Sequence, residues 1–391
     1  MTKIKQLGVV VATLVAGTMT SVAQPKAPNT AELAERIVTK TTGVKKGDIV
    51  QINGGTADMA FMEDLAVAVR KKGAFPLVTV WSESGEKKLM DGVPAEFDTQ
   101  TNAAELALAK TVNVVISIPA VRDASIYEKF PADRQRKLAT AGQVIGQTLL
   151  KRNVRQIELG NGLAPSPSRA KTLGVSEADL STLYWAGLSA DYAAVEDKAK
   201  TLKDALAKGG ELQIKLANGT DLKMKIKGRK VLTSDGVISA DDVKAGGAQL
   251  QAWLPAGEVF LAPVPGSAEG KIVDDRMVFL DKEILGVTAE VKAGKITNIT
   301  AKSGWEIVKP RYDVAGPGKN DIGLFDIGIN PNVKSTGKLE NYVSAGTITI
   351  GSGNNLWAGG TNKEPFGLQF QLTGATVLLD GKPIIENGVL K

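Results

Sequence analysis

The spacing of the apolar residues changes near residue 208, and this change constrains the fold more than any other feature of the chain. Before it, short β-rich runs such as 48–53 and 112–118 alternate with segments of helical periodicity. After it, apolar and polar residues alternate on both sides of Asn218-Gly219, which is the strongest short-range signal of a β-hairpin. The sequence therefore predicts an α/β + β fold, with a mostly parallel sheet in the first half and antiparallel strands in the second.

These patterns divide the chain into two predicted domains. An N-terminal α/β domain is expected over 24–207, and a C-terminal β-rich domain over 208–391. Ser176 is the predicted N-cap of one long helix that reaches towards Leu206 and bridges the two domains. In the second domain, a further hairpin is predicted over 287–299.

The N-terminus has the features of a signal peptide over residues 1–23. Lys3 and Lys5 form a positively charged start, 7–17 is a short apolar run, and small residues precede Gln24. The apolar run is shorter than the roughly 20 residues that a membrane-spanning helix needs. We therefore expect export to a bacterial periplasm or beyond, with no stable membrane insertion after cleavage. An uncleaved N-terminal anchor is the alternative.

The chain contains no histidine and no cysteine. This composition excludes a Ser-His-Asp triad, a Cys-His dyad and any general base that relies on imidazole. Zinc and cobalt sites are built mostly from imidazole nitrogen and thiolate sulfur, so this protein offers a metal only oxygen ligands. Gly54-Gly55 follows the first predicted strand without the Gly-x-Gly-x-x-Gly spacing of a dinucleotide site, and we interpret it as a tight turn.

The charge pattern does not indicate a nucleic-acid partner. The chain has 48 basic and 42 acidic residues, and the two signs are interspersed along it. The densest basic cluster alternates along a predicted strand and has no stacking aromatic residues nearby: Lys223, Lys225, Lys227, Arg229 and Lys230. We interpret the cluster as a solvated strand face.

Several phrases resemble the aminopeptidase T family over nearly the whole mature chain. The most specific is 254–260 (LPAGEVF), which is continued by 267–270 (SAEG). Shorter phrases fall in the order of the family along the chain: 46–50 (KGDIV), 73–78 (GAFPLV), 218–222 (NGTDL), 328–331 (GINP), 346–348 (GTI), 359–362 (GGTN) and 376–381 (TVLLDG). The resemblance implies an N-terminal α/β domain, a β-rich metal-binding domain and a homodimer whose site faces an internal cavity. It also implies peptide hydrolysis at a free N-terminus by two divalent cations.

In the family pattern, two glutamates, two histidines, an aspartate and a tyrosine carry the metal site. Only the first glutamate, Glu258, is retained in this chain. The other five positions correspond to residues that have lost the family's chemistry: Leu324, Thr349, Leu356, Gly367 and Gln369. Glu258 with Thr349 and Gln369 would suit at most a weakly bound hard ion such as Ca²⁺ or Mg²⁺. The resemblance therefore predicts no catalytic residue and no cofactor.

Three hypotheses follow. The first is an exported pseudoenzyme, a homodimer that lacks metallopeptidase activity and has a cavity for a peptide ligand. The second is an aminopeptidase with a non-standard oxygen-ligand site for Zn, Co or Mg, whose carboxylates would come from a larger set: Glu258, Glu269, Asp313, Asp321, Asp326 and Glu364. The third is a cell-envelope interaction protein without a ligand. Contact between Glu258 and Asp326 or Glu364 would favour the second hypothesis, and Leu324 and Leu356 packed beside Glu258 would oppose it.

Overall fold

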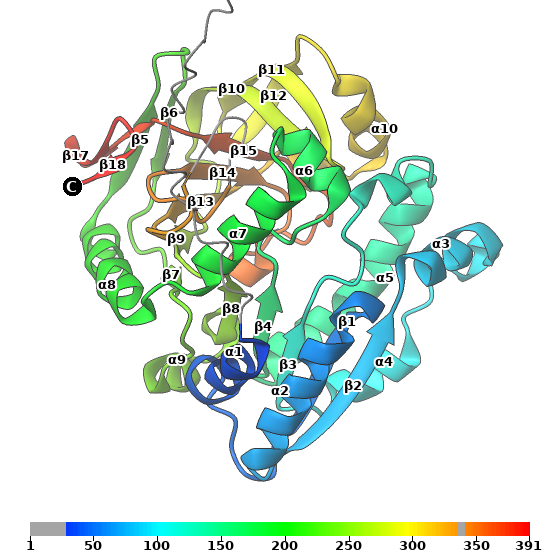
Figure 1. The fold of residues 1–391 in the computed structure, drawn as a ribbon. Coiled ribbons are helices and arrows are strands. Elements are labelled where there is room, and N and C mark those ends of the chain that lie inside the picture. Colours follow the sequence, from blue (N-terminus) through cyan, green and yellow to red (C-terminus); the bar gives the residue numbers. More distant parts are fainter. Residues whose placement is uncertain (1–28, 335–340) are drawn as a thin grey trace, which may run out of the picture.

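The computed structural model describes residues 29–334 and 341–391. The predicted signal peptide over 1–23 lies outside these residues. Figure 1 shows the first half of the chain gathered around one sheet and the second half forming two further sheets. No helix within the two described ranges combines the length and the apolar character needed to cross a membrane.

The helices lie mainly in the first half of the chain. They are α1 (Thr30–Arg36), α2 (Met59–Lys71), α3 (Glu83–Gly92), α4 (Ala103–Ala109), α5 (Ala132–Lys151), α6 (Pro167–Leu173), α7 (Glu177–Leu188), α8 (Tyr192–Lys208), α9 (Ala240–Ala245) and α10 (Trp305–Val314). The strands of the parallel sheet are β1 (Ile49–Gly55), β2 (Phe75–Trp81), β3 (Val114–Ser117), β4 (Arg155–Leu159) and β8 (Gln251–Leu254).

The parallel sheet has the strand order β2-β1-β3-β4-β8. Its central strands are apolar and fully buried at Val50, Ile52, Val114 and Ile116, as expected for a parallel sheet covered on both faces. The last strand, β8, comes from the second half of the chain. The parallel sheet is therefore completed by a segment that follows the β5–β6 hairpin in sequence.

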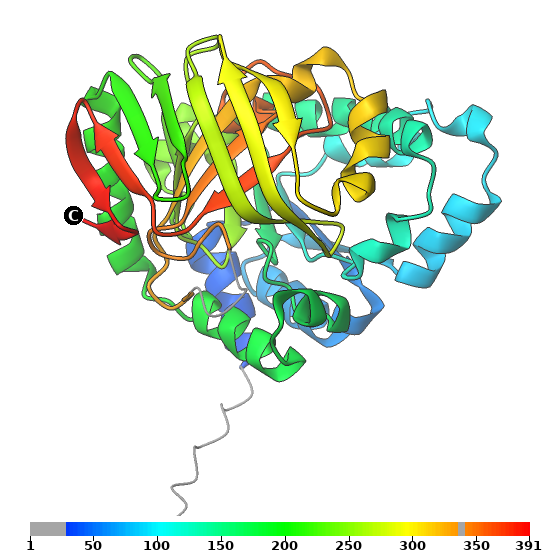
Figure 2. The ribbon, with the colours of Figure 1, turned by 90° about the horizontal axis from the view of Figure 1, so that it is seen from above.

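The second half forms two antiparallel sheets (Figure 2). One has eight strands in the order β12-β11-β10-β6-β5-β16-β17-β18, which are β5 (Glu211–Lys215), β6 (Asp221–Lys225), β10 (Glu269–Phe279), β11 (Lys282–Lys292), β12 (Lys295–Thr300), β16 (Thr376–Leu379), β17 (Lys382–Glu386) and β18 (Val389–Leu390). The other has the order β15-β14-β13-β9-β7, which are β7 (Val231–Ser234), β9 (Glu258–Leu261), β13 (Ile322–Gly328), β14 (Ile348–Ser352) and β15 (Gln369–Leu372).

The two predicted hairpins are confirmed. β5 and β6 pair antiparallel around Asn218-Gly219, and β11 and β12 pair around Ala293-Gly294. Along β6, Leu222 and Met224 are fully buried, while Lys223 between them and Lys225 after them are exposed. This alternation agrees with the interpretation of the basic cluster as a solvated strand face.

The prediction of one bridging helix is wrong, because two helices occupy that segment. Ser176 caps α7 as predicted, since its side chain accepts a hydrogen bond of 3.0 Å from the N–H of Asp179. However, α7 ends at Leu188, and Asp191 begins α8 by accepting from the N–H of Ala193 at 3.1 Å. An aspartate inside a helical pattern is a strong N-cap, and here its capping preference prevails over the apolar periodicity.

Candidate functional site

The candidate site lies on one face of the sheet β15-β14-β13-β9-β7. Residues directly opposite each other in an antiparallel pair point to the same face. Asp326 on β13 lies opposite Phe260 and Thr349, and Thr349 lies opposite Gln371. Glu258 belongs to the same face, because it is two residues before Phe260 on β9. The register therefore places Glu258, Asp326 and Thr349 together.

Glu258 is held by the turn that connects the parallel sheet to β9. The Leu254–Pro255 peptide bond is cis, and Gly257 has a φ of +135°. The Glu258 side chain is 8% exposed, and its Oε2 accepts a hydrogen bond of 2.8 Å from Nδ2 of Asn161. The same Asn161 nitrogen donates to the carbonyl of Pro255 at 3.0 Å. Asn161 therefore fixes both the turn and the carboxyl group that follows it.

The carboxyl groups of Glu258 and Asp326, called the acid pair below, lie within hydrogen-bonding contact when one of them is protonated. Burial raises the pKa of Glu258 to about 7, although the hydrogen bond from Asn161 opposes this shift. Burial and the charge of Glu258 raise the pKa of Asp326 well above its usual range. The nearby carboxyl of Glu158 adds further negative charge, so the pair lies in an environment that disfavours two bare carboxylates.

Among the residues that the structure describes, one oxygen of the acid pair and one oxygen of a neighbouring side chain have no hydrogen-bond partner. They are Oδ1 of Asp326, whose side chain is 4% exposed, and Oγ1 of Thr349, which is fully buried. Buried polar atoms in native proteins almost always have a partner, so each exception needs an explanation.

The structure places only some of the six metal-site positions that the family resemblance implies on the same face of the sheet. Leu324, Thr349 and Gln369 lie on the same face as Glu258. Leu324 packs in a separate apolar cluster with Leu232, Phe260 and Ala358. In this cluster the ring centroids of Trp253, Phe260 and Trp357 lie 5.4–5.5 Å apart. The position of the second family glutamate is therefore part of an apolar core.

The other predicted positions have local surroundings that do not provide a metal ligand. Leu356 begins a short 3₁₀ turn, Leu356–Ala358. Gly367 has no room for a side chain, because a Cβ there would lie 2.0 Å from the backbone oxygen of Ser352. Gln369 Oε1 accepts a hydrogen bond of 2.5 Å from the hydroxyl of Tyr342, which satisfies the oxygen that we considered as an ion ligand.

Of the acids considered for an oxygen-ligand site, only Asp326 contacts the carboxyl group of Glu258. Asp313 pairs with Lys309 at 2.5 Å on the surface, and Asp321 pairs with Lys295. Glu269 accepts from the N–H of Ala293 at 2.7 Å. Glu364 accepts from the N–H of Phe366 at 3.5 Å. These four acids therefore have local partners of their own.

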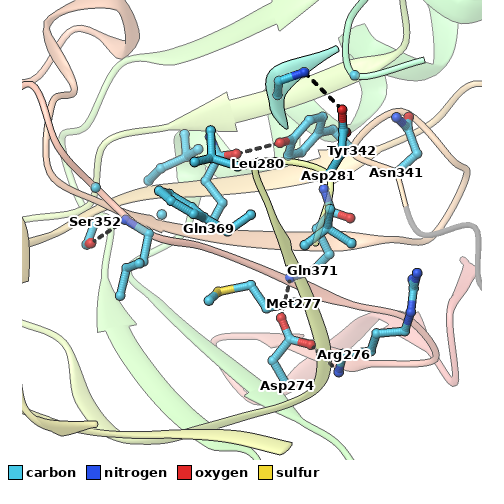
Figure 3. A pocket seen from close by; sticks show the side chains of 18 of the residues that line it. Asp274, Arg276, Met277, Leu280, Asp281, Asn341, Tyr342, Ser352, Gln369 and Gln371 are labelled. Atoms are coloured by element: carbon cyan, nitrogen blue, oxygen red, sulfur yellow. Dashed lines mark hydrogen bonds between the residues drawn. The ribbon is translucent and has the colours of Figure 1, made fainter. Parts of the chain in front are cut away.

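A cavity of about 470 Å³ lies beside the acid pair and is lined by both halves of the chain. Its walls include Leu324, Tyr342, Gln369 and Gln371, together with residues of the β10–β11 hairpin and α6 (Figure 3). Glu258, Asp326 and Thr349 are not among its lining residues. Tyr342 lines the cavity and also lies within electrostatic range of both acids, so it belongs to the surroundings of both the cavity and the acid pair.

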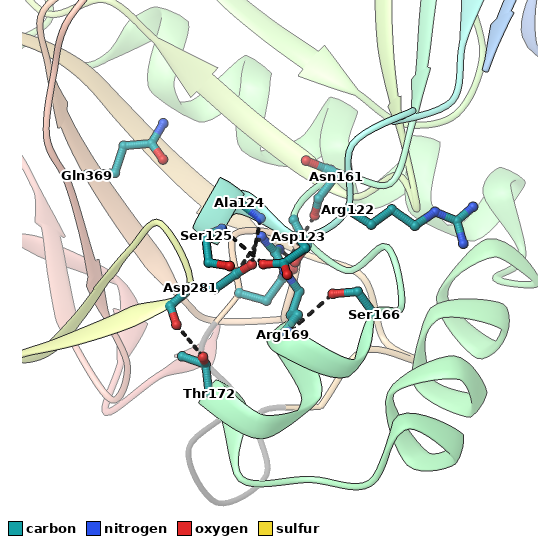
Figure 4. A network of polar contacts seen from close by, with 12 residues as sticks. Arg122, Asp123, Ala124, Ser125, Asn161, Ser166, Arg169, Thr172, Asp281 and Gln369 are labelled. Carbon is teal, nitrogen blue, oxygen red and sulfur yellow. Dashed lines mark hydrogen bonds and ion pairs between the residues drawn. The ribbon is translucent and has the colours of Figure 1, made fainter. Parts of the chain in front are cut away.

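The charged groups of the cavity have hydrogen-bond partners within the protein. Asp281, at the tip of the β10–β11 hairpin, accepts from Arg169 at 3.3 Å and from the N–H of Ala124 at 3.2 Å (Figure 4). Asp274 accepts from the N–H groups of Arg276 and Gln371 at 2.9 and 3.2 Å. Burial raises the pKa of Asp274 to about 6. The remaining polar lining is mostly amide, so the cavity suits an uncharged polar ligand.

Sequence reasoning did not identify Asn161, Glu158 or Tyr342 as site residues. Asn161 carries a weak signal, since it lies between Gly160 and Gly162 and has a positive φ of 38°. Asparagine is one of the few residues that tolerate this backbone region. The residues around Tyr342 and Glu158 in the sequence give no sign of a site. Their proximity to Glu258 is a result of the tertiary fold.

The residues present do not fit the two-cation centre that the family resemblance implies. Within residues 29–334 and 341–391, no group of three or more acidic, His or Cys side chains is placed to share a metal ion. Two divalent cations held close together need several anionic or imidazole ligands. The acid pair supplies two carboxyl groups, and an apolar cluster occupies the space beside it.

Comparison with known proteins places the chain in a family. The sequence model of the thermophilic metalloprotease (M29) family matches residues 26–314. Wild-type AmpT from Thermus thermophilus has a similar structure, with a TM-score of 0.67 and 16% identity over 93% of this chain and 98% of that one. A 2,5-dihydroxypyridine dioxygenase from Pseudomonas putida KT2440 has a TM-score of 0.59 and 15% identity over 93% and 96%. No curated protein matches the sequence. The chain belongs to the thermophilic metalloprotease (M29) family.

Proposed function

We propose that this protein is an exported pseudoenzyme of the M29 family, which lacks aminopeptidase activity and binds a peptide-like ligand in its cavity. The observation that carries the proposal is the apolar cluster of Leu324, Phe260 and Trp357 at the position of a family metal ligand. A site that loses its metal no longer needs polar ligands, and apolar side chains fill it more favourably than unpaired polar groups.

The alternative is an aminopeptidase that uses oxygen ligands alone. Contact between Glu258 and Asp326 supports it, as the sequence argument anticipated. Two observations oppose it: Leu324 packs against Phe260 beside the pair, and neither acid lines the cavity. A water activated at the acid pair would therefore not lie against a peptide in the cavity. We therefore prefer the pseudoenzyme.

A peptide-like ligand suits the chemistry of the cavity. The side chains of Gln369 and Gln371 can exchange hydrogen bonds with a peptide backbone, and Leu324 and Trp357 offer apolar contact. The charges of Asp281 and Arg169 are already paired with each other, so the ligand need not carry a compensating charge.

The proposal is tested by equilibrium dialysis of acetylated and free tripeptides against the protein in buffer supplemented with zinc, cobalt or magnesium. We expect the protein to retain peptide and to release no N-terminal residue, because the two-cation centre is absent. Gln371→Leu should weaken retention about tenfold, the size of effect expected for one lost ligand hydrogen bond. Metal-dependent release of N-terminal residues that Glu258→Gln abolishes would contradict the proposal.

We also propose that the protein is exported and that it forms a homodimer. Support for a dimer comes from the exposed apolar side chains of the edge strand β2, among them Phe75 and Trp81 at 55% and 53% exposure. N-terminal sequencing and sedimentation of the protein from an envelope fraction test both statements. We expect a chain that starts at Gln24 and sediments as a dimer. A monomer, or a chain that retains Met1 in the cytoplasm, would contradict the corresponding statement.

A further inference from the structure

The cavity lies between the open edges of two antiparallel sheets. Among the strands that the structure describes, β15 has a neighbour on its β14 side alone. β10 pairs with β6 over 269–271, and beyond that segment its described partner is β11. Both strands line the cavity, β15 through Gln369 and Gln371 and β10 through 276–279. A strand with a neighbour on one side leaves a row of backbone N–H and C=O groups available for pairing.

The backbone groups of Gln369 and Gln371 are directed towards the open edge of β15. In an antiparallel pair, residues that exchange backbone hydrogen bonds alternate with residues whose backbone groups point away from the partner. The N–H of Ser352 on β14 donates to the carbonyl of Leu368 at 2.9 Å. Counting from this bonded pair, Gln369 and Gln371 have their N–H and C=O groups directed away from β14. The N–H of Gln371 indeed donates to Asp274, which lies on the other side of β15.

Asp274 joins the two strand edges at one end of the cavity. Its carboxyl group accepts from the N–H of Arg276 on β10 at 2.9 Å and from the N–H of Gln371 on β15 at 3.2 Å (Figure 3). The next residues with the same orientation, two positions along each strand, are Val278 on β10 and Gln369 on β15. Both line the cavity and are exposed. A side chain of the protein therefore satisfies the edge at Asp274, and the following edge residues face the cavity.

We propose that the ligand of the cavity is an extended peptide segment that adds a strand to the open edge of β15. One residue of the segment would donate its N–H to the carbonyl of Gln369 and accept from the N–H of Gln369. Strand addition takes its affinity from main-chain hydrogen bonds and its specificity from the surroundings of alternate side chains. Because the backbone amides are recognised, the segment needs no free N-terminus, which an aminopeptidase substrate must have. This inference rests on the proposed peptide-like ligand and specifies how the protein holds it.

The face of the sheet beside β15 suits a neutral segment. Successive side chains of a strand point to opposite faces, so alternate side chains of the segment would lie over the face that carries Leu324 and Gln371. The charged groups nearest to this face, Asp281 and Arg169, are paired with each other at 3.3 Å. We therefore expect a preference for an apolar side chain at every second position, and no requirement for a charge at either end of the segment.

Equilibrium dialysis of the full chain with backbone-modified peptides tests strand addition. The parent probe is acetyl-alanyl-leucyl-alanine amide, whose one large side chain fixes the register. In a series of analogues, each amide N–H is replaced in turn by an ester oxygen, which cannot donate a hydrogen bond. We expect the acetylated parent to be retained as well as the same peptide with a free amine. Ester analogues should alternate along the peptide between about tenfold weaker retention and unchanged retention, because only every second N–H faces β15.

Two variants of the protein test the same edge from the other side. Gln369→Pro removes the N–H at the open edge, a position where a strand tolerates proline. Gln369→Ala removes the side chain and keeps the N–H, so it is the matched control. Retention of the acetylated parent should be about tenfold weaker in Gln369→Pro than in Gln369→Ala, as for one lost hydrogen bond. The ester series uses the wild type, so it gives a result even if Gln369→Pro fails to fold.

The outcomes distinguish the mode of binding from the ligand itself. Equal retention of all ester analogues, or equal retention by the two Gln369 variants, would overturn strand addition and leave a peptide ligand in place. Retention that requires a free amine would also overturn strand addition. Retention of none of the peptides would overturn the proposed ligand and, with it, this mode of binding.

Discussion

Replacing Gly257 with alanine is expected to lower the free energy of unfolding by about 3–5 kcal/mol, the range for strained backbone combined with a steric clash. Gly257 has a φ of +135°, a region that residues with a side chain rarely adopt. A Cβ atom there would lie 2.7 Å from the backbone nitrogen of Asn330. The carbonyl of Gly257 also accepts from the N–H of Ile329 at 2.7 Å, so the two strand ends cannot separate without losing this bond.

Urea denaturation of the Gly257→Ala variant measures this effect, and Gly359→Ala provides a matched control. Gly359 also has a positive φ, +74°, but no atom lies within 4 Å of the added Cβ. The control should therefore lose only about 1 kcal/mol, the cost of the left-handed conformation itself. Equal losses in the two variants would show that the close approach to Asn330 has no energetic consequence.

Replacing Asp326 with asparagine is expected to stabilise the metal-free protein at alkaline pH relative to the wild type. The pKa of Glu258 is about 7 in the folded chain, whereas its ordinary value is 4.5. Between these two pH values the unfolded chain loses its proton first, so the stability of the wild type falls as the pH rises. The asparagine amide can donate to the Glu258 carboxylate and removes one negative charge. The variant also lacks the Asp326 carboxyl, whose own pKa lies well above its usual range, so its stability relative to the wild type should rise between pH 4.5 and 8.

Chemical denaturation of both proteins at the two pH values, in buffer freed of metal ions, gives this difference. Asp274→Asn serves as a control, because Asp274 titrates outside the acid pair and burial raises its pKa to about 6. Its own relative stability should change mainly below pH 6. A difference between Asp326→Asn and the wild type that is the same at both pH values would contradict the raised pKa of the acid pair.

Local signals in the sequence were sufficient to predict the architecture of each half. The Asn218-Gly219 turn and the alternation around it depend on neighbouring residues, and the β5–β6 hairpin forms as predicted. The break between α7 and α8 was missed because the apolar spacing continues through it, while the capping preference of Asp191 interrupts the helix. The place of β8 in the parallel sheet was also missed, since it depends on pairing with β4 almost 100 residues earlier in the chain.

The site was predictable only in part. The phrase LPAGEVF located Glu258, which is buried at the start of β9 as a residue of the candidate site. The partner carboxyl lies at Asp326, two residues after the family position at Leu324 and on the same face of β13. A sequence comparison by position cannot reveal that neighbouring strands bring this second carboxyl to Glu258. Asn161 reaches the site from the other half of the chain, and its role follows from the tertiary fold.

The pairing of β8 with β4 has a consequence for the order in which the protein assembles. Until residue 254 has been synthesised, the parallel sheet has an open edge at β4, and the backbone groups of that edge have no neighbouring strand. Exposed sheet edges pair readily with other chains. The first half of the protein is therefore vulnerable to aggregation until β8 arrives.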